Sequence, residues 1–323
     1  MTTGATEITD RALRRQRLLD RVFHAATVGS AGVVLIILTG IIVSLFIGGW
    51  QALNAFGFGF LTSDEWNPVT ERFGALIPIY GTLVSSFIAL LIAVPISFGI
   101  ALFLTEVAPP WLRRPVGTAI ELLAAIPSII YGMWGLFVFA PVLSEHVQPW
   151  LQAQFGTMPV IGTLFQGAPL GIGMLPAGII LGIMVIPFIT AIMRDVFLTT
   201  PQFLKESAYG LGATQWEVVW NVVMPYTRIA AVGGIFLGLG RALGETMAVT
   251  FVIGNAHRLN LSLYAPGTSI ASTLANEFTE AVGEIHTSSL IALGLVLFMI
   301  TFIVLALAKV LLYTLEARKG AKT

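Results

Sequence analysis

Two oppositely charged residues, Arg241 and Glu245, stand alone in a long apolar stretch of the chain. Twelve uncharged residues separate Arg228 from Arg241. A planar guanidinium can donate two charge-assisted hydrogen bonds to one oxyanion, and the carboxylate four residues later is a possible counter-ion. Arg241 is therefore either an anion-binding cation in a substrate path or one half of a neutralising pair that fixes helix packing. The sequence leaves both interpretations open.

Other reactive constellations are missing from the sequence. The 323 residues include no cysteine, and the four histidines are scattered, so we expect no metal site and no thiol chemistry. No G-x-x-x-x-G-K-[ST] motif occurs, so we do not expect the chain to hydrolyse ATP itself. Neither an H-E-x-x-H motif nor a nucleophile–base pattern is present. We expect no catalytic residue and no cofactor, and hence no enzyme.

Charged residues are too scarce for a typical water-soluble domain. Hydrophobic residues make up 56% of the chain and charged residues 11%, whereas a soluble domain is roughly a quarter charged. Seventeen basic and seventeen acidic residues cancel, which gives no indication of nucleic-acid binding. Runs without Asp, Glu, Lys or Arg cover residues 29–63, 73–105, 122–144, 146–193 and 285–308. Since about 20 apolar residues span a bilayer, the chain is predicted to be a polytopic membrane protein.

Six transmembrane helices fit these runs, because the alternation typical of strands is absent. We place them near 27–50, 76–104, 118–143, 172–197, 229–256 and 287–313. Arg241 and Glu245 then lie near the bilayer midplane, and their i, i+4 spacing predicts one shared helix face. An arginine at that depth costs at least about 2.5–3.5 kcal/mol on insertion scales, so it should face a partner or an aqueous cavity.

The distribution of Lys and Arg orients the chain, because cytoplasmic loops are richer in both. With six helices and the N-terminus inside, fourteen of these residues lie on the cytoplasmic side, and only Arg72 and Arg258 lie outside. We therefore expect both termini in the cytoplasm. The basic N-terminal segment is expected to contact anionic membrane lipid.

The segment between the fourth and fifth helices departs from the apolar pattern. Pro201 suits the start of a helix. Apolar residues then recur at helical spacing up to Gly210 and Gly212, and the same period resumes at Trp216 and stops at Pro225. This pattern predicts two short amphipathic helices joined by a glycine turn, which form a compact knob at residues 198–226 on the cytoplasmic face.

The knob resembles the signature segment of ABC importer permeases, E-A-A-x3-G-x9-I-x-L-P. Here Ser replaces the second signature residue, Val replaces Ile and Met replaces Leu. In that family the segment is a coupling helix that docks in a cleft on a cytoplasmic ATPase subunit. The resemblance implies coupling to an ATPase through the residues at matching positions, which are Glu206, Ser207, Ala208, Gly212 and Pro225.

Motifs along most of the chain resemble the phosphate-specific permeases, and the C-type subunits more closely than the A-type sister subunits. They are Phe60-Leu61-Thr62, Trp66-Asn67-Pro68, Tyr80-Gly81-Thr82-Leu83, Ala93-Val94-Pro95, Leu104-Thr105-Glu106, Ile126-Pro127-Ser128, Tyr131-Gly132, residues 238–246 (GLGRALGET), Ile270-Ala271-Ser272 and Ala275-Asn276-Glu277-Phe278. The resemblance implies inorganic phosphate as cargo. It also implies a heterodimer with a sister (PstA-like) permease, a dimer of cytoplasmic ATPase subunits and an extracytoplasmic phosphate-binding protein.

The sequence thus predicts an all-α protein of the bacterial inner membrane with an ABC importer permease (MetI-like) fold. We expect a basic cytoplasmic tail at 1–26, a transmembrane permease domain at 27–315 and a cytoplasmic tail at 316–323. The expected function is the permease subunit of an ATP-driven phosphate importer. One alternative is a permease for another oxyanion, such as sulfate or molybdate. A second is a stand-alone secondary transporter, which would favour charged groups in several helices.

Overall fold

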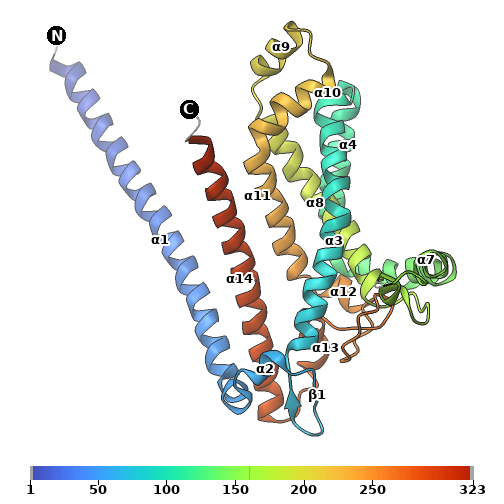
Figure 1. The fold of residues 1–323 in the computed structure, drawn as a ribbon. Coiled ribbons are helices and arrows are strands. Elements are labelled where there is room, and N and C mark those ends of the chain that lie inside the picture. Colours follow the sequence, from blue (N-terminus) through green and yellow to red (C-terminus); the bar gives the residue numbers. More distant parts are fainter. Residues whose placement is uncertain (1–2, 160, 321–323) are drawn as a thin grey trace.

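The computed structural model describes residues 3–159 and 161–320, and helices dominate the fold (Figure 1). Six helical segments are long and apolar enough to cross a membrane, as the composition predicted. They are Leu18–Phe56, Leu76–Val107, Ser128–Phe155, Met174–Leu198, Gln215–Leu243 and Glu284–Thr314. Parts of the predicted tails, residues 1–2 and 321–323, lie outside the described residues. The first helix runs unbroken across the predicted boundary at residue 27.

The longer helices are α1 (Thr3–Phe56), α3 (Leu76–Leu102), α4 (Pro110–Ala124), α8 (Met174–Leu198), α11 (Met224–Leu243) and α14 (Glu284–Gly320). Shorter helices are α2 (Gly59–Thr62), α5 (Ser128–Trp134), α6 (Ala140–Val142), α7 (Gln148–Phe155), α9 (Gln202–Gly210), α10 (Gln215–Val218), α12 (Met247–Thr250) and α13 (Ile270–Glu277). Strands β1 (Trp66–Asn67) and β2 (Arg72–Phe73) form a small antiparallel hairpin. A 3₁₀ turn, η4 (Ile161–Phe165), follows α7.

Two of the predicted spans differ in extent from those in the structure. The third was expected at 118–143, but the chain breaks at 125–127 and the span runs over Ser128–Phe155. Pro127 explains the break, because proline disfavours the helical conformation of the residue before it. The fifth was expected at 229–256, but it runs over Gln215–Leu243, and Gly244 follows as its C-cap. Period and hydropathy alone do not reveal either break.

The most buried span is α8, which packs along α3. In the most apolar part of α8, 61% of the residues are buried inside the chain, whereas the value for the span Leu76–Val107 is 28%. Small residues permit the close approach: a Cβ added at Gly178 would lie 2.6 Å from Cβ of Ile88, and one at Gly182 would lie 3.1 Å from the carbonyl oxygen of Ala89. These two helices therefore form the centre of the fold.

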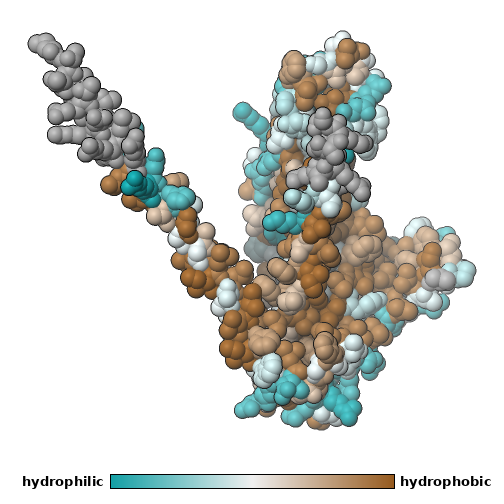
Figure 2. All heavy atoms as spheres, turned by 60° about the vertical axis from the view of Figure 1, so that its left-hand side comes forward, coloured by the Kyte–Doolittle hydropathy of each residue, from teal (hydrophilic) through white to brown (hydrophobic). Residues whose placement is uncertain are grey.

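The first helix leaves the rest of the molecule at a steep angle (Figure 1). It contacts α14 near its C-terminal end, where the Ser288 hydroxyl accepts from the Ala52 amide and donates to the Gly48 carbonyl. Toward its N-terminus the apolar side chains of α1 are exposed, and Figure 2 shows a hydrophobic surface along this arm. Such exposure suits a helix surrounded by lipid or by another membrane subunit.

The two ends of the molecule carry different elements (Figure 1). Both chain ends, α9 and α10 lie at one end, and the β1–β2 hairpin, α2 and α13 lie toward the other. Hydrophilic side chains gather at the hairpin end (Figure 2). This arrangement agrees with an even number of crossings.

Among the described residues, four π-helical turns interrupt the helices, and each lies two residues before a proline; the first precedes Pro109, where the helix also ends. They are η1 (Phe103–Val107), η2 (Gly135–Phe139), η3 (Leu143–Val147) and η5 (Val219–Val223). Pro141, Pro149 and Pro225 follow η2, η3 and η5 by two residues, and the helix continues through each. A proline ring clashes with the carbonyl four residues earlier, and in each case that carbonyl belongs to the wider turn. Pro225 was expected to end the knob, but the helix continues through it into α11.

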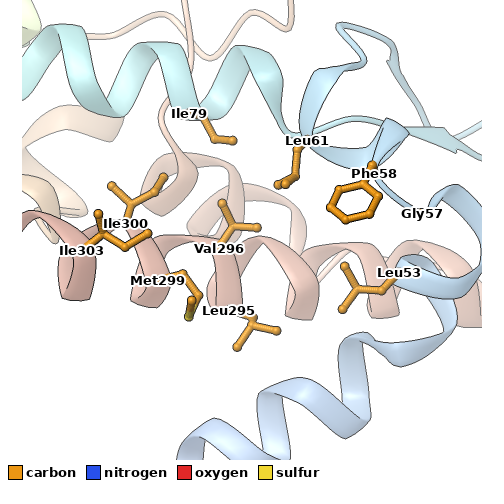
Figure 3. Close-up of a pocket in the computed structure, with 10 residues that line it drawn as sticks. All are labelled: Leu53, Gly57, Phe58, Leu61, Ile79, Leu295, Val296, Met299, Ile300 and Ile303. Atoms are coloured by element: carbon orange, nitrogen blue, oxygen red, sulfur yellow. The ribbon is translucent and has the colours of Figure 1, made fainter.

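A cavity of about 590 Å³ opens where α1, α2, α3 and α14 meet (Figure 3). Leu53, Phe58, Ile79, Val296 and Ile300 are among its lining residues, and every lining side chain is apolar. Because it offers no hydrogen-bond donor to a charged solute, this cavity is not a path for an anion.

The contact between α3 and the segment before α13 makes Gly81 intolerant of a side chain. A Cβ at Gly81 would lie 1.8 Å from the Thr268 carbonyl oxygen. We predict that Gly81→Ala lowers the free energy of unfolding by about 1–3 kcal/mol or more through overpacking. Gly99→Ala on the same helix is the matched control, because nothing lies within 4 Å of its Cβ. Thermal unfolding of the purified protein measures both, and equal stability of the two variants would contradict the prediction.

Candidate functional site

Arg241 lies in the last turn of α11, where it contacts α8. Its guanidinium carbon is 5.2 Å from the centre of the Phe188 ring, which is within cation–π range. The Nε atom is buried and has no hydrogen-bond partner among the described residues. A buried guanidinium hydrogen without an acceptor is unfavourable, so Arg241 has a donor that the described residues leave unused.

Glu245 does not pair with Arg241 in the described part of the chain. The prediction that Arg241 and Glu245 share one helix face is wrong, because α11 ends at Leu243 and Gly244 follows as its C-cap. Oε1 of Glu245 instead accepts a hydrogen bond of 3.2 Å from the Ala248 amide, in the first turn of α12. The carboxylate therefore pairs with the amide at the start of α12, and no carboxylate among the described residues forms an ion pair with Arg241.

A second helix break, at 125–127, lies near Arg241. The Tyr131 hydroxyl donates to the Leu123 carbonyl across this break at 3.0 Å. Tyr131 lies close enough to Arg241 for the two side chains to interact electrostatically. Gly132 brings α5 against α12, since a Cβ there would lie 3.0 Å from the Met247 carbonyl oxygen. No role was predicted for Tyr131 from the sequence, although Pro127 within an apolar run is a signal for the break.

The knob has the predicted pair of helices and glycine turn. Gly212 has φ +87°, a left-handed conformation that favours glycine. Its amide donates to the Tyr209 carbonyl at 2.9 Å, and the Ala213 amide donates to the Ala208 carbonyl at 3.1 Å. These two bonds form a Schellman motif, which ends α9. A capping box between Thr214 and Glu217 then starts α10.

A buried ion pair attaches the knob to η1, the turn that follows α3. Nζ of Lys205 lies 2.6 Å from Oε1 of Glu106, and both side chains are almost fully buried. The Gln215 side-chain amide also donates to the Glu106 carbonyl, at 2.5 Å. One residue of η1 thus holds both helices of the knob. From the sequence, Lys205 was only one of the basic residues that orient the chain, because no spacing rule links residues 99 positions apart.

The free side of the knob carries exposed apolar side chains. Leu211 is 91% exposed at the tip, and Phe203 and Trp216 are also exposed. Of the residues at signature positions, Glu206, Ser207, Gly212 and Pro225 are exposed, and Ala208 is half-buried. A rigid, attached element with an apolar tip is suited to dock into a groove on another protein.

Four aromatic rings and one carboxylate meet at the hairpin end of the molecule. Glu277 accepts hydrogen bonds from Nε1 of Trp66 at 2.8 Å, Nε2 of His257 at 2.8 Å and Nε2 of His286 at 3.1 Å. The His257 ring stacks on Trp66 at 5.3 Å, and His286 stacks on Phe73 at 4.9 Å. This cluster joins the hairpin, the loop before α13, α13 and α14. The histidines appeared scattered in the sequence, and only the fold brings two of them together.

Comparison with known proteins covers most of the chain. Residues 93–315 match the family described as "Binding-protein-dependent transport system inner membrane component". The chain belongs to this family. As a transport component of an ABC importer, the permease is not an enzyme, and it is an inner-membrane protein.

Curated relatives of this permease are similar over nearly their full length. It is 61% identical over 312 residues to the phosphate transport system permease protein PstC of Mesorhizobium japonicum, which covers 97% of this chain and 95% of that protein. It is 39% identical over 297 residues to the probable PstC of Methanocaldococcus jannaschii, with 90% and 93% covered.

A solved structure supports the predicted fold of the permease. The inward-facing MetNI methionine ABC transporter matches 73% of this chain and 94% of its own chain, with a TM-score of 0.53 and 16% identity. At this identity the similarity concerns the fold alone, which agrees with the expected MetI-like architecture.

The pKa of Glu277 makes the cluster of the permease sensitive to acid. Burial raises the pKa of this carboxyl, but hydrogen bonds from His257 and Trp66 and the charge of His257 outweigh burial, so the pKa lies below its ordinary value of 4.5. Because the pKa is lower in the folded chain, the carboxylate stabilises the fold above the ordinary value. That stabilisation is lost as the pH falls through the lower folded value.

We predict that Glu277→Gln lowers the free energy of unfolding of the permease by about 1–3 kcal/mol at neutral pH, because charge-assisted hydrogen bonds are lost. The difference from the unmodified protein should shrink as the pH falls below about 4. Thermal unfolding at several pH values measures this. Glu280→Gln, at an exposed acid nearby, should change little, and a pH-independent difference for Glu277→Gln would contradict the assignment.

Proposed function

We infer that this chain is the membrane-spanning permease subunit of an ATP-driven phosphate importer. Family membership supports the transport class, and the names of the relatives support the cargo. The observation that carries the inference within this chain is Arg241, a guanidinium without a carboxylate partner in the described part and with a buried Nε that no acceptor satisfies.

Arg241 is proposed to bind phosphate transiently on its way through the membrane. Its planar fork can donate two hydrogen bonds to two oxygens of a phosphate ion. Phosphate carries up to two negative charges, so one arginine does not balance it. We propose that the sister permease, PstA-like and paired with this chain as a heterodimer, supplies a further cation. Glu245 is close in sequence and repels an anion, which favours release over tight binding.

The knob is proposed to couple the permease to the energy source. The sequence has no ATP-binding loop, so a dimer of cytoplasmic ATPase subunits must supply the energy. We propose that the knob tip docks into a groove on one cytoplasmic ATPase subunit and moves when the ATPase dimer closes. Because Glu106 ties the knob to α3, this movement is passed directly to the helix that packs on α8.

The proposed orientation puts the knob and both termini in the cytoplasm. The excess of Lys and Arg supports this orientation, and the knob lies at the same end of the molecule as both chain ends (Figure 1). The hairpin end then faces the extracytoplasmic side, where a phosphate-binding protein delivers its cargo. Residues 1–26 and 316–323 remain proposed cytoplasmic tails of a permease domain at 27–315.

Two other functions remain distinguishable from this proposal. A permease for sulfate or molybdate would use the same arginine chemistry, so only a cargo assay separates it. A stand-alone secondary transporter would work without an ATPase. It would need no docking element, which makes the attached knob with its exposed apolar tip an argument against it.

Arg241→Gln is predicted to reduce phosphate uptake by roughly 100-fold or more, since two charge-assisted hydrogen bonds are worth about 1.5–3 kcal/mol each. Uptake of labelled phosphate at low external phosphate is measured in cells that lack the gene and carry either version of it. Arg258→Gln, at the outer side, is the control.

The same strains test the proposed function. Uptake that returns with the unmodified gene, fails on ATP depletion and resists excess sulfate supports a phosphate importer. Normal uptake by Arg241→Gln, with the complex assembled, would remove Arg241 from the substrate path. Competition by excess sulfate would instead indicate a permease for another oxyanion.

Leu211→Asp at the knob tip is predicted to reduce co-purification of the ATPase subunits by about tenfold or more, as expected for the loss of an apolar anchor. Leu211 is 91% exposed, so the substitution should not affect folding. Val69→Asp is the matched control, because Val69 is 92% exposed at the opposite end. Equal ATPase recovery with both variants would refute docking at the knob tip.

A further inference from the structure

A hollow of about 310 Å³ lies between α4, α8 and η1, toward the knob end of the molecule. Three arginines line it, Arg113 and Arg114 from α4 and Arg194 from α8, together with Glu121 and Thr118. Arg194 follows Phe188 by six residues, which is about 9 Å along the helix, so the hollow is separate from the contact between Phe188 and Arg241. The proposed function uses none of these arginines.

Two of the guanidinium groups are held in place by the surrounding chain. Nε of Arg113 donates to the Ala108 carbonyl at 2.8 Å. Nη2 of Arg194 donates to Glu121 at 2.7 Å and to Asp195 at 3.1 Å. Gly117 leaves room for this group, because a Cβ there would lie 2.6 Å from Nη1 of Arg194. The hollow is therefore a defined arrangement and not only a group of mobile surface charges.

Positive charge exceeds negative charge in this hollow. Both nearby carboxylates, Glu121 and Asp195, are bound to Arg194. Among the residues that the structure describes, no carboxylate lies within 4.0 Å of Arg113 or Arg114. Both arginines also stand in the first turns of α4, which has no acidic residue in its first turn and whose helix dipole opposes a cation. An anion in the hollow would offset these repulsions.

We propose that this hollow binds a phosphate-type oxyanion, either a free phosphate ion or the phosphate headgroup of an anionic lipid, at a site distinct from Arg241. Arg113 and Arg114 supply the hydrogen-bond donors, and Arg194, fixed over Gly117, closes the α8 side. Thr105 of η1 also lines the hollow, and the next residue, Glu106, binds Lys205 of the knob. An occupant thus contacts the turn that holds the knob.

The test measures the rate at which phenylglyoxal, a reagent for arginine, modifies each guanidinium in the purified complex, with mass spectrometry as the readout. The complex is placed in phosphatidylcholine nanodiscs without phosphate, in the same discs with inorganic phosphate, and in phosphatidylglycerol discs without phosphate. Arg228 is the control, because it is an exposed arginine near the same end. A bound oxyanion should slow modification of Arg113 and Arg114 by about tenfold relative to Arg228.

The three conditions separate the two sources of the ligand. Protection by phosphate in phosphatidylcholine identifies a free anion, and protection in phosphatidylglycerol alone identifies a lipid headgroup. Arg113 and Arg114 that react like Arg228 in all three conditions would overturn the proposal.

Gly117→Ala separates a built site from general surface charge. The substitution retains every charge, but its Cβ displaces the Arg194 guanidinium, so the protection of Arg113 and Arg114 should be lost. Gly99→Ala, where the added Cβ meets nothing within 4 Å, should retain it. Full protection in Gly117→Ala would show attraction by charge alone and would also overturn the proposal.

Discussion

Every backbone group removed from water needs a hydrogen-bond partner, and this requirement governs the centre of the fold. Regular helices meet it without help, but the chain breaks at 125–127 and again at 244–246. At both breaks a side chain bonds to a backbone group that has lost its helical partner. The Tyr131 hydroxyl donates to the Leu123 carbonyl, and Glu245 accepts from the Ala248 amide. Because Glu245 is used in this way, Arg241 lacks the counter-ion that its sequence neighbour would otherwise supply.

The buried Lys205–Glu106 pair holds the knob against the turn that follows α3. Removing two charges from water is costly, so such a pair is weak as a source of stability. Its geometry is nevertheless restrictive, because either charge alone would be buried without a partner if the two groups separated. The knob is therefore expected to move together with the end of α3, and α3 carries α8 with it through their close, small-residue contact.

Much of this architecture follows from local sequence. The apolar runs predicted six crossings, and Pro201, Gly212 and the helical period predicted the knob. What local sequence does not contain is long-range pairing. Glu106 and Lys205, or Trp66 and Glu277, are far apart along the chain, and only the packed fold brings each pair together. The end of α11 was missed for a related reason: residues 244–256 are apolar enough for a helix, and the break depends on side-chain contacts around Gly244 and Glu245.

The wide turns before Pro141, Pro149 and Pro225 also affect which residues face which neighbour. A π-helical turn holds one residue more than the α-helical ladder requires, and in an α-helix each residue advances the side chains by about 100° around the axis. The stripe of residues beyond each turn is therefore rotated relative to the stripe before it. In the segment Gln215–Leu243, η5 lets the knob portion and the α11 portion present independent faces on one unbroken helix. The two portions therefore meet different neighbours at a fixed angular offset, and a rotation of one portion turns the other with it.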